Sequence, residues 1–145
     1  MPGIVVGING SPNSERALDW AVSHAAALQV PVTVLAVHEV PKSYWGNIPV
    51  TGPADAALLP NLRRAAEEMT QKAVDRLGET RPPEVNVRAV NGFVVRELIE
   101  ASRHADLIVI GTPSGGTLSR LVMGSVSHEV VQHSASPVVI VPLHA

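Results

Sequence analysis

The sequence predicts a doubly wound α/β domain, in which helices cover both faces of a mainly parallel sheet. Two observations predict it. Five short runs rich in valine and isoleucine recur along the 145 residues, and a helical pattern lies between most consecutive runs. Strands that are connected through helices pair in parallel by right-handed crossovers. Because no linker divides the chain, we expect a single domain over residues 1–145.

The five apolar runs are the expected strands. Four of them are almost continuously apolar, as strands buried on both faces are. In the third, valine and alanine alternate with Asn86 and Arg88, which predicts a strand at an edge of the sheet. The runs are Ile4–Ile8, Val32–Val37, Val85–Val90, Leu107–Ile110 and Val138–Val141.

Four helices are expected from apolar residues that recur at spacings of three and four. The first begins with Ser11 as its N-cap and Pro12 at its first position. Serine is a favoured N-cap residue, and proline is favoured at the first position of a helix. The residues that mark the four helices are Ala17, Leu18, Ala21, Ala25 and Leu28; Leu58, Leu62, Ala65, Met69, Ala73 and Leu77; Val95, Leu98, Ile99 and Ser102; and Val126, Val130 and Val131.

The segment Pro41–Pro60 interrupts this alternation. It carries several prolines and glycines together with Tyr44 and Trp45. We interpret it as a long irregular loop, and its role as a lid over a ligand or as a plain insertion stays open.

In a doubly wound sheet the ligand crevice opens at the carboxyl ends of the strands where the winding reverses. Here these are the first and fourth strands, which end at Asn9-Gly10-Ser11 and at Gly111-Thr112. Between Gly111 and Ser127, glycines and hydroxyl residues stand between a strand and a helix. Backbone N–H groups and the helix dipole bind anions at such a place, so the sequence predicts an anionic ligand there.

Several function classes are disfavoured by missing features. Gly111 and Gly116 have the Walker A spacing, but Thr117 stands where the lysine is required. The fingerprints G-x-G-x-x-G and G-x-S-x-G are absent. A net charge of −2 and no cysteine argue against nucleic-acid or membrane partners and thiolate–metal sites. With neither a membrane span nor a signal peptide in the sequence, we expect a cytoplasmic protein.

The chain resembles the universal stress protein family along its whole length. That family has a loop G-x2-G-x9-G-[S/T] after the fourth strand, followed by a segment such as L-G-S-V-S. Gly111 and Gly124-Ser125 have the matching separation, and Met-Gly-Ser-Val-Ser closes the loop. Similar segments are Ile-Val-Val-Gly-Ile-Asn-Gly-Ser at the start, Gly92 before the third helix, Ala-Asp-Leu-Ile-Val-Ile-Gly before the loop, and Gln-His-Ser-Ala-Ser-Pro-Val-Val-Ile-Val-Pro at the end.

The resemblance implies a flavodoxin-like, Rossmann-like sheet with strand order 3-2-1-4-5. It implies a homodimer in which the last strand, within Pro137–Pro142, pairs across a two-fold axis. Such pairing would cover an otherwise exposed apolar edge. It also implies an ATP-binding regulatory or protective module in the stress response, with Mg²⁺ as an open question, a protein partner that is unknown, and at most slow ATP hydrolysis.

Carried over position by position, the resemblance places adenine at the backbone of Val37 and beside Asn9. The phosphates would meet Gly111, Ser114, Gly124, Ser125 and Ser127, and Pro113 and Val126 complete the set. Two positions depart from the family pattern. Ser114 replaces a glycine of the loop, and Asn9 replaces an aspartate, which together predict weaker binding by about tenfold to a hundredfold.

Alternatives stay open at this point. Simple N-capping by Ser125, a tight turn at Gly124 and a turn at Asn9 that bonds its own backbone explain those residues without a ligand. For the whole protein, the alternatives are a dimeric interaction protein of the same fold that binds no ATP, or a protein that binds cyclic AMP. A flavin carrier would need a phosphate loop after the first strand, and Asn9–Ser14 is too poor in glycines and hydroxyls for that.

Overall fold

The computed structural model describes residues 3–39, 44–45, 48–49, 55–112 and 124–142. Its centre is a five-stranded sheet in the order β5-β2-β1-β6-β7, in which all neighbours pair in parallel. Counted along the chain, the main strands therefore have the predicted order 3-2-1-4-5. They are β1 (Ile4–Ile8), β2 (Val32–His38), β5 (Val85–Asn91), β6 (Leu107–Gly111) and β7 (Val138–Val141).

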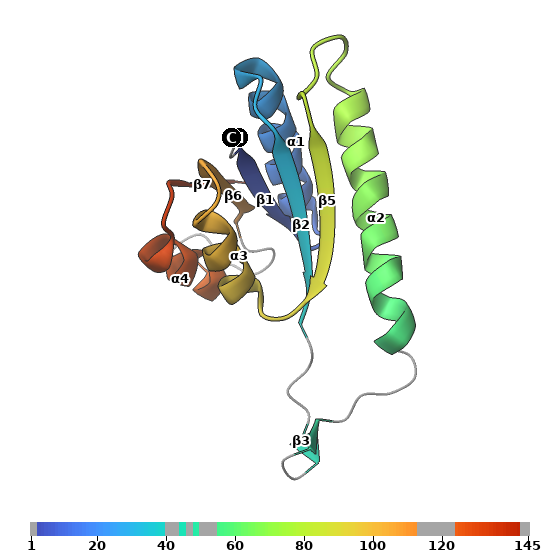
Figure 1. Cartoon of the computed structure of the whole chain (residues 1–145), viewed down its shortest axis with the longest axis vertical. Helices are drawn as coiled ribbons and strands as arrows, with labels where there is room; N and C mark the ends of the chain where they lie inside the picture. Colours follow the sequence, from blue (N-terminus) through green and yellow to red (C-terminus); the bar gives the residue numbers. More distant parts are fainter. Residues whose placement is uncertain (1–2, 40–43, 46–47, 50–54, 113–123, 143–145) are drawn as a thin grey trace.

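Two helices cover each face of the sheet, as Figure 1 shows. On one face, α1 (Pro12–Leu28) lies beside α2 (Asp55–Asp75). On the other, α3 (Val94–Ser102) contacts α4 (Ser125–His133). The chain changes face after β5, so β1 and β6, which are neighbours in the sheet, lead into helices on opposite faces. The winding therefore reverses between these two strands.

Apolar side chains on each face of the sheet pack against the helices that cover it. Leu18 and Val22 of α1 are fully buried against β1 and β2, and Ala66 and Ala73 of α2 belong to the same cluster. On the other face, Leu98 of α3 belongs to a second cluster; its other buried members are Leu35, Ile108, Ile110 and Val130. Burial of this apolar surface is the main force that holds the helices to the sheet.

The predicted start of α1 is confirmed. Ser11 is the N-cap, Pro12 follows at the first helical position, and the Ser11 hydroxyl accepts a hydrogen bond from the Ser14 backbone N–H. The prediction that the third strand lies at an edge is also confirmed, because β5 has one neighbour, β2, and its side chains alternate between half-buried and exposed.

The predicted irregular loop over Pro41–Pro60 is wrong at its second half. Helix α2 begins at Asp55 and runs through Pro60. Within the first half, Tyr44–Trp45 (β3) and Ile48–Pro49 (β4) pair as a short antiparallel ribbon. A proline inside a helix removes one backbone hydrogen bond. The alanines and leucines around Pro60 are strong helix formers, and the helix continues through it.

Four residues expected on buried helix faces are exposed. Two of them, Leu28 and Leu58, lie near a helix end and are 65% and 38% exposed. In α2, Ala66 and Ala73 are buried, whereas Ala65, the neighbour of Ala66, faces solvent. In α4, Val130 is fully buried, whereas Val131 is 46% exposed. The sequence pattern places a helix face only to within one residue, and small differences in how each helix sits on the sheet decide which of two adjacent apolar residues is covered.

The last strand, β7, forms the other edge of the sheet. Its first three residues are half-buried, and only Val141 is fully covered. The predicted pairing of Pro137–Pro142 with a second copy of the chain stays a prediction. Among the described residues, no helix is both long enough and apolar enough to span a bilayer.

Candidate functional site

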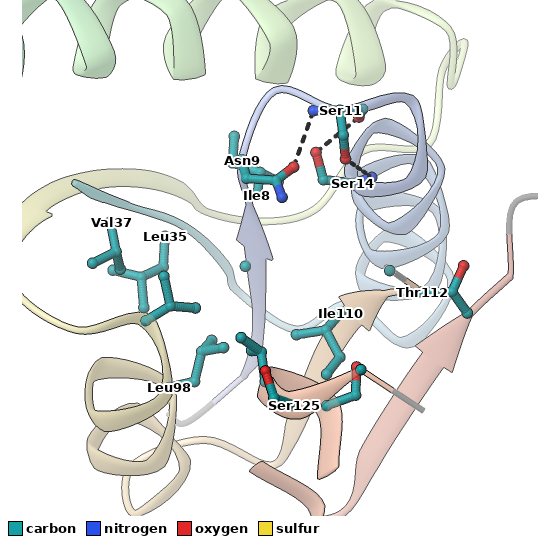
Figure 2. Close-up of a pocket in the computed structure, with 16 residues that line it drawn as sticks. Ile8, Asn9, Ser11, Ser14, Leu35, Val37, Leu98, Ile110, Thr112 and Ser125 are labelled. Atoms are coloured by element: carbon teal, nitrogen blue, oxygen red, sulfur yellow. Dashed lines mark hydrogen bonds between the residues drawn. The ribbon is translucent and has the colours of Figure 1, made fainter. Parts of the chain in front are cut away.

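A pocket of about 320 Å³ opens at the carboxyl ends of the strands, where the winding of the sheet reverses. This is the place at which doubly wound sheets bind ligands, and it is the crevice that the sequence predicts. Its walls come from the ends of β1, β2 and β6 and from the beginnings of α1, α3 and α4 (Figure 2). The volume lies at the lower end of the range for small-molecule sites.

The lining of the pocket is apolar on one side and mixed around the rest. Figure 2 shows Leu35, Val37 and Leu98 together on one side. The hydroxyl residues Ser11, Ser14, Thr112 and Ser125 lie around the remainder, with Ile110 among them. The described residues that line it are Gly7, Ile8, Asn9, Ser11, Ser14, Leu35, Val37, Val94, Leu98, Ile110, Gly111, Thr112, Gly124, Ser125, Val126 and Ser127. Such a division suits a ligand with a flat apolar part and a polar or anionic part.

The structure brings most of the predicted site residues to this one pocket. Those that line it are Asn9, Val37, Gly111, Gly124, Ser125, Val126 and Ser127. Pro113 and Ser114 lie outside the described residues. That these residues contact a ligand stays a prediction.

Sequence reasoning missed part of the lining. Leu35, Leu98 and Ile110 were expected only as core residues, and Ser14 and Val94 were not singled out. For Leu35 a signal existed, since Leu35 and Val37 lie two apart on one strand and therefore share a face. Leu98 carries no such signal, because only the packing of α3 over the sheet brings it to the pocket.

Three helix N-termini surround the pocket, and their backbone donors are used differently. In α1, Pro12 has no N–H and the Ser14 N–H donates to the Ser11 hydroxyl. In α3, the Val94 N–H donates to the Glu39 carboxylate over 3.0 Å. In α4, the N-cap is Gly124, which has no side chain to accept a hydrogen bond, and no other described side chain accepts one from the first turn. The first N–H groups of a helix have no partner within the helix, so among the described residues the first turn of α4 presents donors that suit an anion.

The Glu39 carboxylate gives a testable contribution to stability. It binds the first N–H of α3, where a negative charge also interacts favourably with the helix dipole. We expect Glu39→Ala to lower the free energy of unfolding by about 1 kcal/mol, or the midpoint of thermal unfolding by about 3 °C. Differential scanning calorimetry measures this, with Glu79→Ala, an exposed glutamate in a turn, as the control. Equal midpoints for the two variants would contradict the contribution.

The polar contacts of Asn9 and Ser125 answer two of the alternatives. The Ser11 N–H donates to the Asn9 Oδ1 over 3.0 Å, so Asn9 forms the turn with its own backbone (Figure 2). Its oxygen is engaged there, which leaves the Nδ2 donors for other partners. Ser125 is not the N-cap of α4, because Gly124 occupies that position and has an extended backbone with φ −60°. Simple N-capping therefore does not explain Ser125.

The described lining contains no group that titrates near neutral pH and no cation. Its side chains are aliphatic, hydroxyl or amide, or absent in the case of glycine. General acid–base catalysis needs a titratable group within reach of the substrate, and none is offered by these residues. Within the described ranges, no group of three or more histidine, cysteine, aspartate or glutamate side chains could hold a metal ion.

Comparison with protein families agrees with this geometry. The model of the universal stress protein family matches residues 2–142. The chain belongs to this family. A curated universal stress protein of Mycolicibacterium smegmatis is 32% identical over 139 residues, which cover 96% of this chain and 47% of that protein. The chain thus spans about half the length of the curated relatives that it matches.

Solved structures of other family members have the same fold. A universal stress protein in complex with cAMP has a TM-score of 0.68 and 27% identity, with 98% of this chain and 97% of that chain covered. A universal stress protein from Archaeoglobus fulgidus in complex with dAMP has a TM-score of 0.59 and 26% identity, with 97% of each chain covered.

Proposed function

We propose that this universal stress protein binds an adenine nucleotide in the pocket between β1 and β6 and acts as a nucleotide-responsive regulatory or protective module. The observation that carries the proposal is the N-terminus of α4, which no described side chain caps, in the lining of a pocket that is apolar on one side. The phosphate would bind the first N–H groups of α4 and the hydroxyls of Ser125 and Ser127. The base would lie against Leu35, Val37 and Val94. The complexes of two relatives with adenine nucleotides support this choice of base.

ATP is the first ligand to test, with and without Mg²⁺. A specific observation favours cyclic AMP as the second. The pocket measures about 320 Å³, and none of its described lining residues is a lysine or arginine. A triphosphate carries several negative charges that such residues usually neutralise, whereas a cyclic phosphate carries one and is more compact.

The rest of the proposal concerns assembly and location. We expect a cytoplasmic homodimer that pairs through the edge strand β7 within Pro137–Pro142, and a protein partner that responds to the bound state. A dimeric interaction protein whose pocket stays empty is the competing function.

Calorimetric titration of the purified protein with ATP, AMP, cyclic AMP and adenosine tests the proposal. We expect a dissociation constant in the micromolar range, about −8 kcal/mol, for at least one of the nucleotides, and weaker binding of adenosine because it lacks the phosphate. The protein should first be freed of any nucleotide that it carries through purification. Absence of binding at millimolar concentrations of all four compounds would overturn the proposal in favour of the interaction protein.

A further inference from the structure

Asn13 makes a polar contact between the first turn of α1 and Thr112, the residue that follows β6. It lies in the first turn of α1, where its side chain is directed at the end of β6 and is only 4% exposed. Its Nδ2 donates to the backbone oxygen of Thr112 over 2.6 Å and lies 3.2 Å from the Thr112 hydroxyl. These residues are 99 positions apart in the sequence. Removal of the Asn13 amide would deprive both Thr112 oxygens of this donor.

The same turn of α1 also packs closely on the residue before Thr112. A Cβ added to Gly111 would lie 2.5 Å from the backbone oxygen of Asn13 and 3.2 Å from the Ser14 nitrogen. The backbone of Asn13 therefore rests on Gly111, while its side chain holds Thr112. Together these contacts fix the end of β6 relative to α1.

Asn13 acts on the pocket from outside it. Gly111 and Thr112 line the pocket, and Asn13 itself does not. Gly124, at the N-terminus of α4, lines the same pocket as Thr112. The orientation of Thr112 thus sets the edge of the pocket on the side where we expect the phosphate.

We propose that Asn13 is a positioning residue for the phosphate end of the bound nucleotide and acts through Thr112. This inference rests on the proposed function. A positioning role predicts different effects on ligands with and without a phosphate, whereas a role only in protein stability predicts the same effect on both. Loss of the Asn13 amide should weaken ligands that carry a phosphate, whereas adenosine, held mainly on the apolar side, should bind almost as before.

The test is the ratio of the dissociation constants of adenosine and AMP, measured by calorimetry for the wild type and for Asn13→Ala. We expect AMP to bind about tenfold more weakly to the variant, or about 1.4 kcal/mol, and adenosine to change less than about twofold. Asn86→Ala removes an exposed amide on β5 that makes no contact with the pocket, and both constants should stay unchanged.

A second variant keeps the proposal testable if Asn13→Ala folds poorly. Thr112→Val preserves the side-chain volume and the backbone acceptor and removes only the hydroxyl acceptor at 3.2 Å. It should weaken the binding of AMP by about threefold. In the double variant, the loss of affinity for AMP should be smaller than the product of the losses in the two single variants, because the residues interact. If both ligands weaken equally in Asn13→Ala, or if neither changes, the positioning role is wrong. If the wild type binds neither compound, the failure is that of the proposed function itself.

Discussion

Replacing Gly111 with alanine is expected to lower the free energy of unfolding by about 3 kcal/mol, near the upper end of what overpacking costs. The new Cβ would lie 2.5 Å from the backbone oxygen of Asn13 and 2.7 Å from its carbonyl carbon. These atoms belong to the first turn of α1 and cannot rotate away as a side chain does. The helix would have to shift, which would also break the 2.6 Å hydrogen bond between Asn13 and Thr112. Chemical denaturation followed by circular dichroism measures the loss.

Gly7→Ala is the matched control for this prediction. Gly7 lies on the neighbouring strand β1, and its added Cβ would meet side-chain atoms, with Leu98 Cδ2 at 3.1 Å and Ile110 Cγ2 at 3.6 Å. Side chains can adjust by a few tenths of an ångström, so we expect a loss of about 1 kcal/mol. If Gly111→Ala were as stable as Gly7→Ala, the close packing of α1 on the end of β6 would be refuted.

The second large effect is expected on binding. Gly124→Asp should weaken AMP and ATP at least about a hundredfold, or about 2.7 kcal/mol, and at the same time leave the protein as stable or slightly more stable. Gly124 is the N-cap of α4 with φ −60° and ψ 159°, a backbone that aspartate adopts readily. Aspartate is a favoured N-cap, and its carboxylate would accept from the N–H groups that we assign to the phosphate. The side chain would therefore stabilise the helix and repel the ligand.

Gly124→Asn separates the two causes. Asparagine caps helices as well as aspartate does but brings no charge, so it should weaken the nucleotides by about tenfold and leave adenosine less affected. Binding is measured by calorimetry and stability by thermal unfolding on the same samples. Wild-type affinity of Gly124→Asp for AMP would show that the phosphate does not lie at the N-terminus of α4.

The structure explains why the predicted elements were mostly found and where the prediction failed. The strands β1 and β7 have the predicted bounds, and the other three end only one residue later. The strands of a parallel sheet can be predicted well, because each is a continuous apolar run in the sequence and such a run is a strong local signal. The predicted loop extended too far, to Pro60, because Pro60 and the nearby glycines dominate the local pattern. In the structure, α2 already begins at Asp55, and this helix packs on β2 and β5.

The sequence by itself determined the α/β class, the edge position of the third strand, the N-cap at Ser11 and the family. It also located the crevice. The strand order places the reversal of winding between β1 and β6, and the residues that follow these two strands can be read from the sequence. These features depend on residue types and on spacings along the chain, and both can be read in one dimension.

Only the tertiary structure decided what the crevice can do. It showed that Glu39 binds the N–H of Val94 and that the N-cap of α4, Gly124, has no side chain to cap the helix. It also showed that Asn13 holds Thr112 from 99 positions away. Hydrogen bonds between segments so far apart depend on angles and distances that the packing of helices on the sheet sets to within an ångström, and no local pattern carries that information.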